Sequence, residues 1–321
     1  MIIEMIVQDS ETGVTHDISE LLLETKWQTT MEGQPGKLTF SYVNDKDVTF
    51  KEGSVISFKA NNKGVFFGYV FKRGKDKDEI ITITAYDQMR YLKNKDACII
   101  ENSTASEAFS NLCKRFKLVS IVASPSSYKL AKRAYDGKTV FDIIQRGIDE
   151  TLINIGEWYI IYDDFGVLTF NKLTALQTDI TIGDNQLLRN YNFESSIDDD
   201  TYNQVKIIKD DTTPPEIVRD SESIARYGLL QYFEKVDEEA NAAQIAARAD
   251  MILKLKNRPT KKLKLPCLGD LKVRAGSSIV LEISDLAQEG IAVGQNFIIT
   301  DCEHTFKSDL HFMELEVLLS I

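Results

Sequence analysis

The stretch "NNKGVFFGYVFKRG", Asn61 to Gly74, decides how the first third of the chain folds. Its opening residues predict a hairpin turn, because asparagine and glycine tolerate positive φ. The strand that follows points successive side chains to opposite faces, and neither face is polar. One face carries Val65, Phe67, Tyr69 and Phe71, and the other carries Phe66, Gly68 and Val70. We therefore expect other parts of the molecule to cover both sides of this strand.

Several short strands surround this stretch. Ser54–Ala60 alternates between apolar and polar residues, and Glu79–Tyr86 forms the next strand after a charged turn. Two earlier strands are expected near Ile18–Gln28 and Lys37–Tyr42, divided by the turn "EGQPG". Short strands separated by regular turns are typical of a small barrel or sandwich, which we predict over residues 1–97.

The hydrophobic period changes in residues 98–185. The segment "TASEAFSNLCKRF" predicts a helix that begins with a capping box of Thr104 and Glu107. The segment "GKTVFDIIQRGI" predicts a second helix, whose buried face consists of Val140, Phe141, Ile144 and Ile148. The segment "EWYIIYDDFGVLTFN" predicts a hairpin. Together these elements predict a compact α+β insert.

Residues 186–321 return to β structure. The segments "YNQVKIIK" and "RYGLLQYFE" predict strands, and four further strands follow Pro259. Between them, residues 238–257 predict one long alanine-rich helix with basic residues near its end, where they favour the helix dipole. The predicted fold class is therefore mainly β with an α+β insert, in which residues 1–97 and 186–321 form two β barrels.

The two β regions resemble each other in strand order and in one short motif. "KEGSVISF" (Lys51–Phe58) is similar to "RAGSSIVL" (Arg274–Leu281), chiefly through a Gly-Ser pair. A duplicated architecture and a chance similarity between two β barrels are both compatible with so weak a match. We use duplication as the working hypothesis.

Composition excludes several protein classes. A length of 321 residues allows two or three domains, and no apolar run approaches the roughly 18 residues of a membrane span. The first residues lack the basic flank and long apolar core of a signal peptide. Cys98, Cys113, Cys267 and Cys302 are scattered, which predicts reduced thiols in a protein made in the cytoplasm.

The net charge of −11 is uneven, with −2 in residues 1–97, −2 in residues 98–185 and −7 in residues 186–321. Affinity for duplex nucleic acid comes mainly from lysine and arginine neutralising phosphates. A chain this acidic is therefore not expected to bind nucleic acid specifically.

Two short motifs resemble parts of nucleotide-binding sites, but the residues that such sites also require are missing. "DGKT" at Asp136–Thr139 lacks the first glycine of a P-loop, because Lys132 stands in its place. "DFG" at Asp164–Gly166 has no accompanying glycine-rich or catalytic loop, so it predicts a hairpin turn.

A metal site is the other candidate for chemistry. Alternation places Cys302 and His304 on one face of a strand, and His311 is a possible third ligand. No second ligand pair at zinc spacing exists, so structural roles are favoured. We predict no catalytic residues, no metal and no cofactor.

Candidate interface residues come from two places. The all-apolar strand offers Phe66, Gly68 and Val70, and the basic segment Lys254–Leu265 offers Lys261, Lys262 and Lys264. That segment fits either a solvated helix end with a lysine-guarded edge strand, or a docking patch for an acidic partner. The alanines of the long helix likewise fit packing within the subunit or against a neighbouring one.

The succession of segments resembles the baseplate hub family of contractile phage tails, which includes the late-control-protein-D type. Hubs of prophages and phage-like bacteriocins of Gram-positive hosts are the most similar. The marks are dispersed over nearly the whole chain: Trp27 before "GQPGKLTFSY", then "FKEGSVISF", "GVFFGYVF", "AYDQMRYL", "TASEAFSNL", "GKTVFDIIQ", "EWYIIYDDFGVLTF", "YNQVKII", "DSESIARYGLLQ" and "LKVRAGSSIVLEI" with "FIITDCEHTF".

The resemblance implies a non-enzymatic homotrimer with two tube-protein-like β barrels in each subunit. Three subunits would form a ring of six barrels that joins the sixfold tail tube to the threefold central spike. The implied partners are the tail tube protein, the spike, the tape-measure protein and other baseplate proteins, without a membrane. Such a protein is made in the bacterial cytoplasm and becomes part of a phage tail or phage-like particle.

Two other functions stay open at this point. One is a tail-associated peptidoglycan hydrolase seated in residues 98–185, which an assay on purified peptidoglycan would detect. The other is a carbohydrate-binding receptor module. Such a module would expose aromatic platforms, whereas Trp27 and Trp158 lie within predicted strands.

Overall fold

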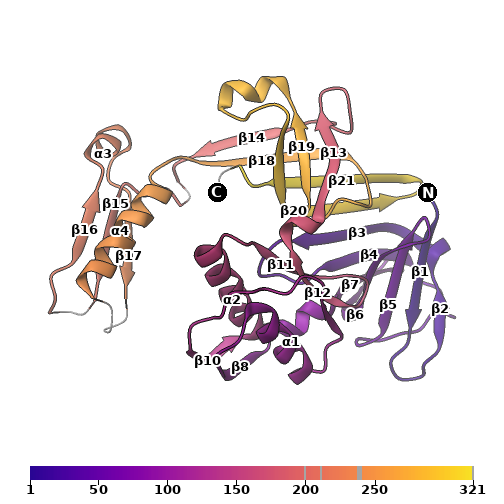
Figure 1. Cartoon of the computed structure of the whole chain (residues 1–321). Helices are drawn as coiled ribbons and strands as arrows, with labels where there is room; N and C mark the ends of the chain where they lie inside the picture. Colours follow the sequence, from indigo (N-terminus) through magenta and orange to yellow (C-terminus); the bar gives the residue numbers. More distant parts are fainter. Residues whose placement is uncertain (199, 210–211, 237–240, 320–321) are drawn as a thin grey trace. The chain divides into compact units, whose positions relative to one another are not determined.

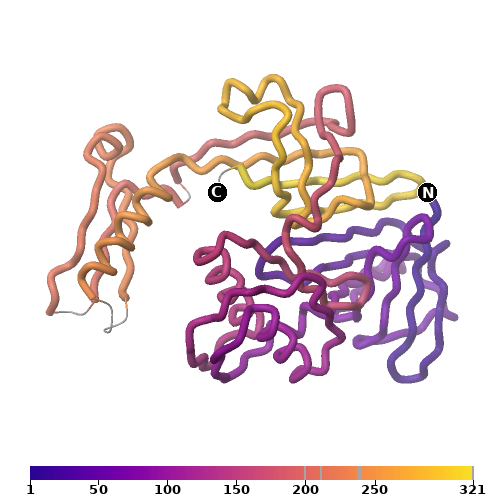
Figure 2. The backbone as a smooth tube through the Cα atoms, in the orientation of Figure 1, coloured from indigo at the N-terminus to yellow at the C-terminus, as the bar shows by residue number. Residues whose placement is uncertain are grey.

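The computed structural model describes residues 1–198, 200–209, 212–236 and 241–319 (Figures 1 and 2). Contacts group the chain into two compact units: residues 1–191 with 264–321, and residues 192–263. The predicted mainly β fold class is confirmed, because strands predominate and the helices are few. The predicted boundaries after residues 97 and 185 stay a prediction.

The first β region forms one antiparallel sheet with the neighbour order β3-β4-β7-β6-β5-β1-β2. Its elements are β1 (Ile3–Gln8), β2 (Thr15–Asp17), the short helix η1 (Ser19–Leu21), β3 (Leu22–Thr30), β4 (Lys37–Val43), β5 (Val55–Ala60), β6 (Lys63–Lys75) and β7 (Ile80–Tyr86). The predicted turn between β5 and β6 is confirmed, since Asn61 and Asn62 have φ of 49° and 62°. Ile56, Phe58 and Ala60 are fully buried in the core of this region.

The insert combines two helices with two small sheets. Its elements are η2 (Gln88–Lys93), β8 (Lys95–Ile100), α1 (Ala105–Arg115), β9 (Ser120–Val122), β10 (Arg133–Thr139), α2 (Val140–Ile155), β11 (Tyr159–Asp163), β12 (Leu168–Lys172) and η3 (Leu173–Leu176). The predicted capping box is confirmed, because Thr104 Oγ1 accepts from Glu107 N and the Glu107 carboxylate accepts from Thr104 N. The predicted buried face of α2 is also confirmed.

The second β region repeats the strand order of the first. Its elements in the first unit are β13 (Gln177–Gly183), β18 (Thr260–Leu268, entered from the second unit), β19 (Ser278–Glu282), η4 (Ser284–Glu289), β20 (Gln295–Lys307) and β21 (Leu310–Val317). The neighbour order β18-β21-β20-β19-β13 matches β4-β7-β6-β5-β1 strand for strand. One difference is that β13 runs parallel to β19, whereas β1 runs antiparallel to β5.

Hydrogen bonds support the duplication at the Gly-Ser motif. Gly53 N donates to Val70 O and Val70 N donates to Ser54 O, at 2.8 and 2.9 Å. In the second region, Gly276 N donates to Ile299 O and Ile299 N donates to Ser277 O, both at 2.8 Å. The two glycines have φ of 86° and 85°, a backbone conformation that glycine adopts without strain. The short sequence match therefore marks one structural motif built twice.

The two β regions join through a direct strand pair. β3 runs antiparallel to β20, with His304 opposite Trp27, so the two sheets form one continuous sheet (Figure 1). The Trp27 and His304 rings stack with their centroids 5.1 Å apart.

The second unit is a small α+β domain. Its elements are β14 (Asn192–Ser196), β15 (Gln204–Ile208), β16 (Glu216–Arg219), α3 (Ser221–Tyr227), β17 (Gln231–Lys235), α4 (Ala242–Lys256) and the first residues of β18. α4 packs Ile245 and Ala249 against Val205 and Ile207 of the sheet. The alanine-rich helix is confirmed over Ala242–Lys256, and its predicted start at residues 238–240 lies outside the described residues.

The prediction of a single strand over "RYGLLQYFE" is wrong at its beginning. Helix α3 occupies the chain up to Tyr227, and β17 begins only at Gln231. The side chain of Asp220 caps α3 by accepting from Glu222 N and Ser223 N. Gly228, with φ of 79°, ends it. A helix cap and a terminal glycine therefore outweigh the β-forming residues between them.

Candidate functional site

Both faces of β6 pack against other parts of the chain along most of its length, and Phe71, 36% exposed, lies at the margin of this cover. Phe66 and Val70, each 2% exposed, point into the core of the first β region. On the other face, Phe67 meets Phe165 of the β11–β12 turn with ring centroids 5.9 Å apart. The next aromatic pair along this face is Tyr69 with Tyr91 of η2, at 5.8 Å. The insert therefore packs against the first β region through a layer of aromatic rings.

Gly68 lies where two parts of the chain come too close for any side chain. A Cβ atom built at Gly68 would lie 2.3 Å from the Tyr86 carbonyl oxygen and 2.6 Å from Cζ of Phe66. Since the nearer atom belongs to the backbone, it cannot move aside cheaply. The predicted close approach at Gly68 is confirmed as a contact within the subunit. A contact between subunits through Phe66, Gly68 and Val70 stays a prediction.

We expect Gly68→Ala to lower the free energy of unfolding by about 1–3 kcal/mol, because the added methyl overpacks the contact with Tyr86. Gly74→Ala is the matched control, because its Cβ would approach nothing nearer than the Thr82 carbonyl oxygen at 3.9 Å in the same strand. Urea unfolding of both variants tests this. Equal midpoints for the two would contradict the prediction.

A buried charged cluster lies where the insert and the two β regions meet. The Asp87 carboxylate accepts from Gly36 N at 2.8 Å and from Met89 N at 2.9 Å, and Asp163 accepts from Gly166 N at 2.6 Å. Arg274 donates to the Asp163 carbonyl oxygen at 3.1 Å. Burial raises the pKa of Asp163 to about 6, and burial together with the Asp163 charge raises the pKa of Asp87. We name Asp87, Asp163 and Arg274 the junction cluster.

The junction cluster is enclosed by aromatic rings. The Arg274 guanidinium lies 4.6 Å from the ring centre of Tyr162 and 5.8 Å from that of Trp27. Tyr162 belongs to the insert and Trp27 to β3, so a cation of the second β region contacts both other parts of this unit. This arrangement fits a structural joint, because the arginine is fixed by the main chain and rings of other segments and its charge lowers the pKa of two buried carboxyl groups, opposing the effect of burial.

The candidate metal ligands occupy opposite sides of one imidazole. His304 donates from Nε2 to the Val273 carbonyl oxygen at 2.8 Å, and Cys302 Sγ lies 3.2 Å from the same nitrogen. His311 Nε2 lies 2.8 Å from Nδ1 on the other side of the ring. Cys302 and His311 therefore do not converge with His304 on a single point. Within the described residues, no group of three or more such side chains is arranged to hold a metal ion.

Burial keeps this histidine pair neutral. It lowers the pKa of His304 to about 3, with a further contribution from neighbouring His311. It lowers the pKa of His311 to about 4, against the opposing effect of Asp270. Burial also raises the pKa of the Cys302 thiol. These groups act as packed polar members of a ring stack that includes Phe306, at 4.4 Å from His311.

The outer face of β20 and β21 is acidic. Asp301 lies opposite Glu316 and Glu303 lies opposite Glu314, so like charges face each other on neighbouring strands. Such pairs are destabilising. One partial compensation is Lys26, whose ammonium lies 3.1 Å from the Glu303 carboxylate. We name Asp301, Glu303, Glu314 and Glu316 the acidic face; it lines a cavity of about 310 Å³.

The predicted basic residues do not form one patch on the first unit. Lys264 is exposed, lies opposite Glu316 and lines the same cavity as the acidic face. Lys261 and Lys262 are exposed on the part of β18 that belongs to the second unit. In α4, Ala249 is buried in the core of the second unit, whereas Ala242, Ala243 and Ala247 are exposed. Whether these residues contact another subunit stays a prediction.

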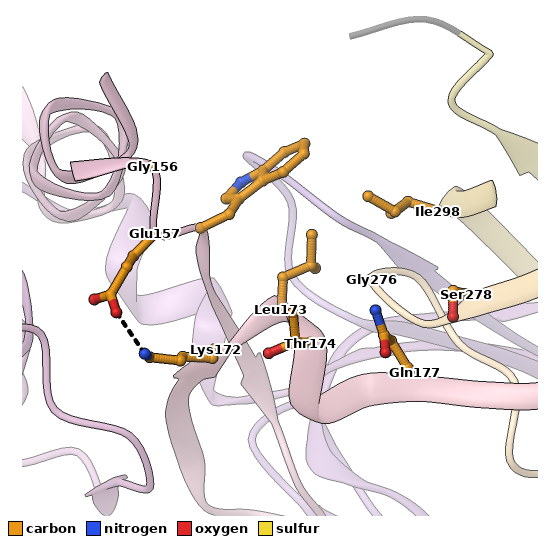
Figure 3. Close-up of a pocket in the computed structure, with 10 residues that line it drawn as sticks. Gly156, Glu157, Lys172, Leu173, Thr174, Gln177, Gly276, Ser278 and Ile298 are labelled. Atoms are coloured by element: carbon orange, nitrogen blue, oxygen red, sulfur yellow. Dashed lines mark hydrogen bonds and ion pairs between the residues drawn. The ribbon is translucent and has the colours of Figure 1, made fainter. Parts of the chain in front are cut away.

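A second cavity, of about 330 Å³, lies between the insert and the second β region (Figure 3). Leu173, Ile298 and Trp158 make it largely apolar, and the ion pair between Glu157 and Lys172, 2.6 Å apart, lies at its rim. Lys172 lowers the pKa of Glu157, with help from Tyr159, so this carboxylate stays ionised. A general acid needs the opposite shift, so the cavity does not present one. Trp158 precedes β11 rather than lying within a strand.

Comparison with known proteins now places the chain. A family model described as YqbQ-like matches residues 25–318. The chain belongs to the YqbQ-like family. It is 27% identical to YqbQ of Bacillus subtilis strain 168, over 93% of this chain and 95% of that protein. It is also 26% identical to XkdQ of the phage-like element PBSX of the same organism, over 83% of this chain and 82% of XkdQ.

Solved structures of phage tail proteins share the fold. The 43 kDa tail protein of prophage MuSo2 from Shewanella oneidensis superposes with a TM-score of 0.71 at 14% identity, over 98% of both chains. A tail protein from Neisseria meningitidis MC58 gives a TM-score of 0.68 at 13% identity, over 99% of this chain and 96% of that one. The resemblance to tail proteins is thus confirmed at the level of fold, and the narrower assignment to hubs stays a prediction.

Sequence reasoning missed the junction cluster and the acidic face. Asp87, Asp163 and Arg274 are far apart in the chain, and each lies beside an ordinary turn signal. The acidic face had a local signal, because acidic residues alternate in "TDCEH" and "MELEV".

Among the described helices, none combines the length and apolar character needed to cross a bilayer.

Proposed function

We propose that the chain is a structural, non-enzymatic baseplate hub of a contractile phage tail or phage-like particle. The observation that carries the proposal is the duplication: two sets of five strands with the same strand order lie in one chain, and β3 of the first region pairs with the second half of β20 in the second region. A homotrimer would place six such sheets around one axis and so match a sixfold tube while keeping threefold symmetry for a spike. The family relationship to XkdQ and the shared fold of tail proteins support a tail component.

The partners follow from that position. The tail tube protein would bind one end of the ring and the central spike the other. The tape-measure protein would occupy the channel, and other baseplate proteins would contact the outside. Synthesis in the bacterial cytoplasm and incorporation into the particle follow from the same proposal.

The mass of the isolated protein in solution tests the proposal. We expect a trimer of 36.3 kDa chains by analytical ultracentrifugation, either alone or on addition of the spike protein. A protein that stays monomeric at high concentration with its spike present would argue against a hub. Release of soluble fragments from purified peptidoglycan would favour the hydrolase instead.

The acidic face provides a test of the channel. If it lines the lumen of a ring, it repels phosphates there and keeps a passing polyanion from binding. We expect the triple variant Asp301→Lys, Glu303→Lys, Glu314→Lys to gain duplex DNA binding whose affinity falls steeply with salt.

The control for this test places the same charge change elsewhere, in Asp136→Lys, Asp149→Lys, Asp179→Lys. All three control residues are exposed. We expect at least about tenfold weaker DNA binding by the control than by the channel variant at 150 mM salt, because a lumen concentrates the field of three subunits. Equal affinities would place the acidic face outside any channel.

A further inference from the structure

The duplicated sheets can be aligned residue by residue through a shared irregularity. The β6–β7 ladder shifts register between Val70 and Lys72, and the β20–β21 ladder shifts between Ile299 and Asp301. Because Val70 and Ile299 also make the same hydrogen bonds to the Gly-Ser motif, they are equivalent positions. It follows that Lys72 corresponds to Asp301.

β20 uses one of its edges twice. β19 pairs with its first part, Gln295 to Ile298, and β3 pairs with its second part, Asp301 to Phe306. β6 begins in the same way, because β5 pairs with Lys63 to Tyr69. Beyond that point, no strand of the described chain pairs with the same edge of β6. Residues 72–75 therefore present a row of backbone groups at the place where β20 accepts β3.

The counterpart of β3 is the strand that contains residues 188–196. Cys267 of β18 is equivalent to Tyr42 of β4. Leu188 forms a bridge with Cys267, just as Leu22 of β3 pairs with Tyr42, so Leu188 is equivalent to Leu22. Arg189 N and Asn190 N both donate to the Pro266 carbonyl oxygen, so one extra residue follows Leu188. β3 has an extra residue at the same place, between Leu22 and Glu24. Counting on from there, Phe193 takes the position of Trp27. β14 is the terminal strand of this sheet and lies beside β18, so its other edge has no strand neighbour in the described chain.

We propose that residues 190–196 of one copy pair with the second half of β6 in a neighbouring copy, just as β3 pairs with β20 within one chain. This inference rests on the proposed trimer and names the surfaces that form it. The two surfaces differ, so each copy binds one neighbour through residues 190–196 and the other neighbour through the second half of β6. Contacts of that kind close into a ring when the rotation permits.

The charges of the two surfaces agree with this pairing. Lys72 and Arg73 make the β6 edge basic, while Lys75 is paired with Glu79. The described part of the incoming strand, residues 190–196, carries Glu194 and no lysine or arginine. Transferring the β3–β20 register places Glu194 opposite Gly74 and diagonal to Lys72 on the same face. Long side chains reach across such a diagonal.

Disulfide trapping tests the register directly. Gly74→Cys is sterically tolerated, since its Cβ meets nothing within 3.4 Å, and Glu194 is exposed. We expect the double variant Gly74→Cys, Glu194→Cys to form disulfide-linked dimers and trimers on mild oxidation. Neither single variant should do so, nor should Gly74→Cys with Ser195→Cys, whose side chain points to the opposite face.

Charge reversal provides a second readout that needs no new cysteine. We expect Lys72→Glu or Glu194→Lys alone to raise the dissociation constant of the oligomer at least about tenfold, and the two together to restore most of the affinity. Restoration by the second change separates a specific contact from a folding defect.

The outcomes distinguish this inference from the proposed function. An oligomer by mass that yields no disulfide between position 74 and positions 192, 194 or 196 would overturn the pairing and leave the hub intact. A protein that remains monomeric and uncrosslinked at high concentration, with the spike present, would overturn both.

Discussion

Replacing Arg274 with methionine should lower the free energy of unfolding by about 3–5 kcal/mol at pH 7.5, the largest effect of any single substitution considered for this chain. Methionine keeps much of the side-chain volume between Tyr162 and Trp27 but removes the cation. Asp163 and Asp87, 7% and 5% exposed, would then lose the favourable charge of the nearby guanidinium, and the Asp163 carbonyl oxygen would lose its hydrogen bond from Arg274. Urea unfolding at constant ionic strength measures the loss.

The loss of unfolding free energy caused by Arg274→Met should become smaller at lower pH, because protonation of Asp163 removes its buried negative charge. The pKa of Asp163 in the folded protein, about 6, lies above the ordinary 3.8. Its contribution is therefore most favourable when it is protonated, and stability is lost as pH rises through the folded value. Removing Arg274 raises that pKa further, so the variant should be closest to the wild type near pH 4.5.

Two further variants make the Arg274 result specific. Arg146→Met changes an exposed arginine on α2 and should alter stability by no more than about 0.5 kcal/mol. Asp163→Asn keeps an oxygen for Gly166 N but removes the charge, so it should recover part of the loss in the Arg274→Met background. If Arg274→Met unfolds at the same urea concentration as Arg146→Met, the cluster does not hold the parts together.

Local patterns predicted the elements well where the deciding signals lie close in the chain. The capping box of Thr104 and Glu107, the turn at Asn61 and Asn62, and the repeated Gly-Ser motif were all found from short stretches. Helix α3 carries the same kind of signal in Asp220 and Gly228, but the β-forming residues of "RYGLLQYFE" overlap its end and predict a strand there.

The sequence pattern of β6 alone does not predict which of its faces enters the core. Both faces are apolar, and the choice depends on Tyr91 and on Phe165, which lies about a hundred residues further along the chain. The junction cluster is harder still, since no periodicity relates Asp87 to Asp163 or Arg274. Such sites arise from tertiary packing, and a single sequence carries no spacing rule for them.

The buried histidine pair predicts a second large effect, a loss of stability in mild acid. His304 has a folded pKa of about 3, far below its ordinary 6.5. The unfolded chain therefore binds a proton below pH 6.5 that the folded chain does not bind. Stability is full above pH 6.5 and declines as pH falls toward the folded value. His304 alone should lower the free energy of unfolding by about 2 kcal/mol between pH 8 and pH 5.

The structure explains why the folded state resists this proton. His304 already donates from Nε2 to Val273 and receives His311 at Nδ1, so a second proton on its ring must displace the hydrogen of His311. Arg274 adds a repulsive charge nearby, whereas Asp270 acts favourably only on the more accessible His311. Asp163 works in the opposite direction over the same range, because its raised pKa makes it more favourable in acid.

A difference between variants isolates the histidine, because the contribution of Asp163 is then common to both proteins. We expect His304→Gln to be less stable than the wild type at pH 8, since the glutamine replaces a ring stacked on Trp27. The gap should narrow by about 2 kcal/mol at pH 5, because glutamine does not titrate. Phe58→Leu, a core change beside Phe306, should instead shift stability equally at both pH values. A His304→Gln gap that stays constant from pH 8 to pH 5 would show that the buried imidazole does not control acid stability.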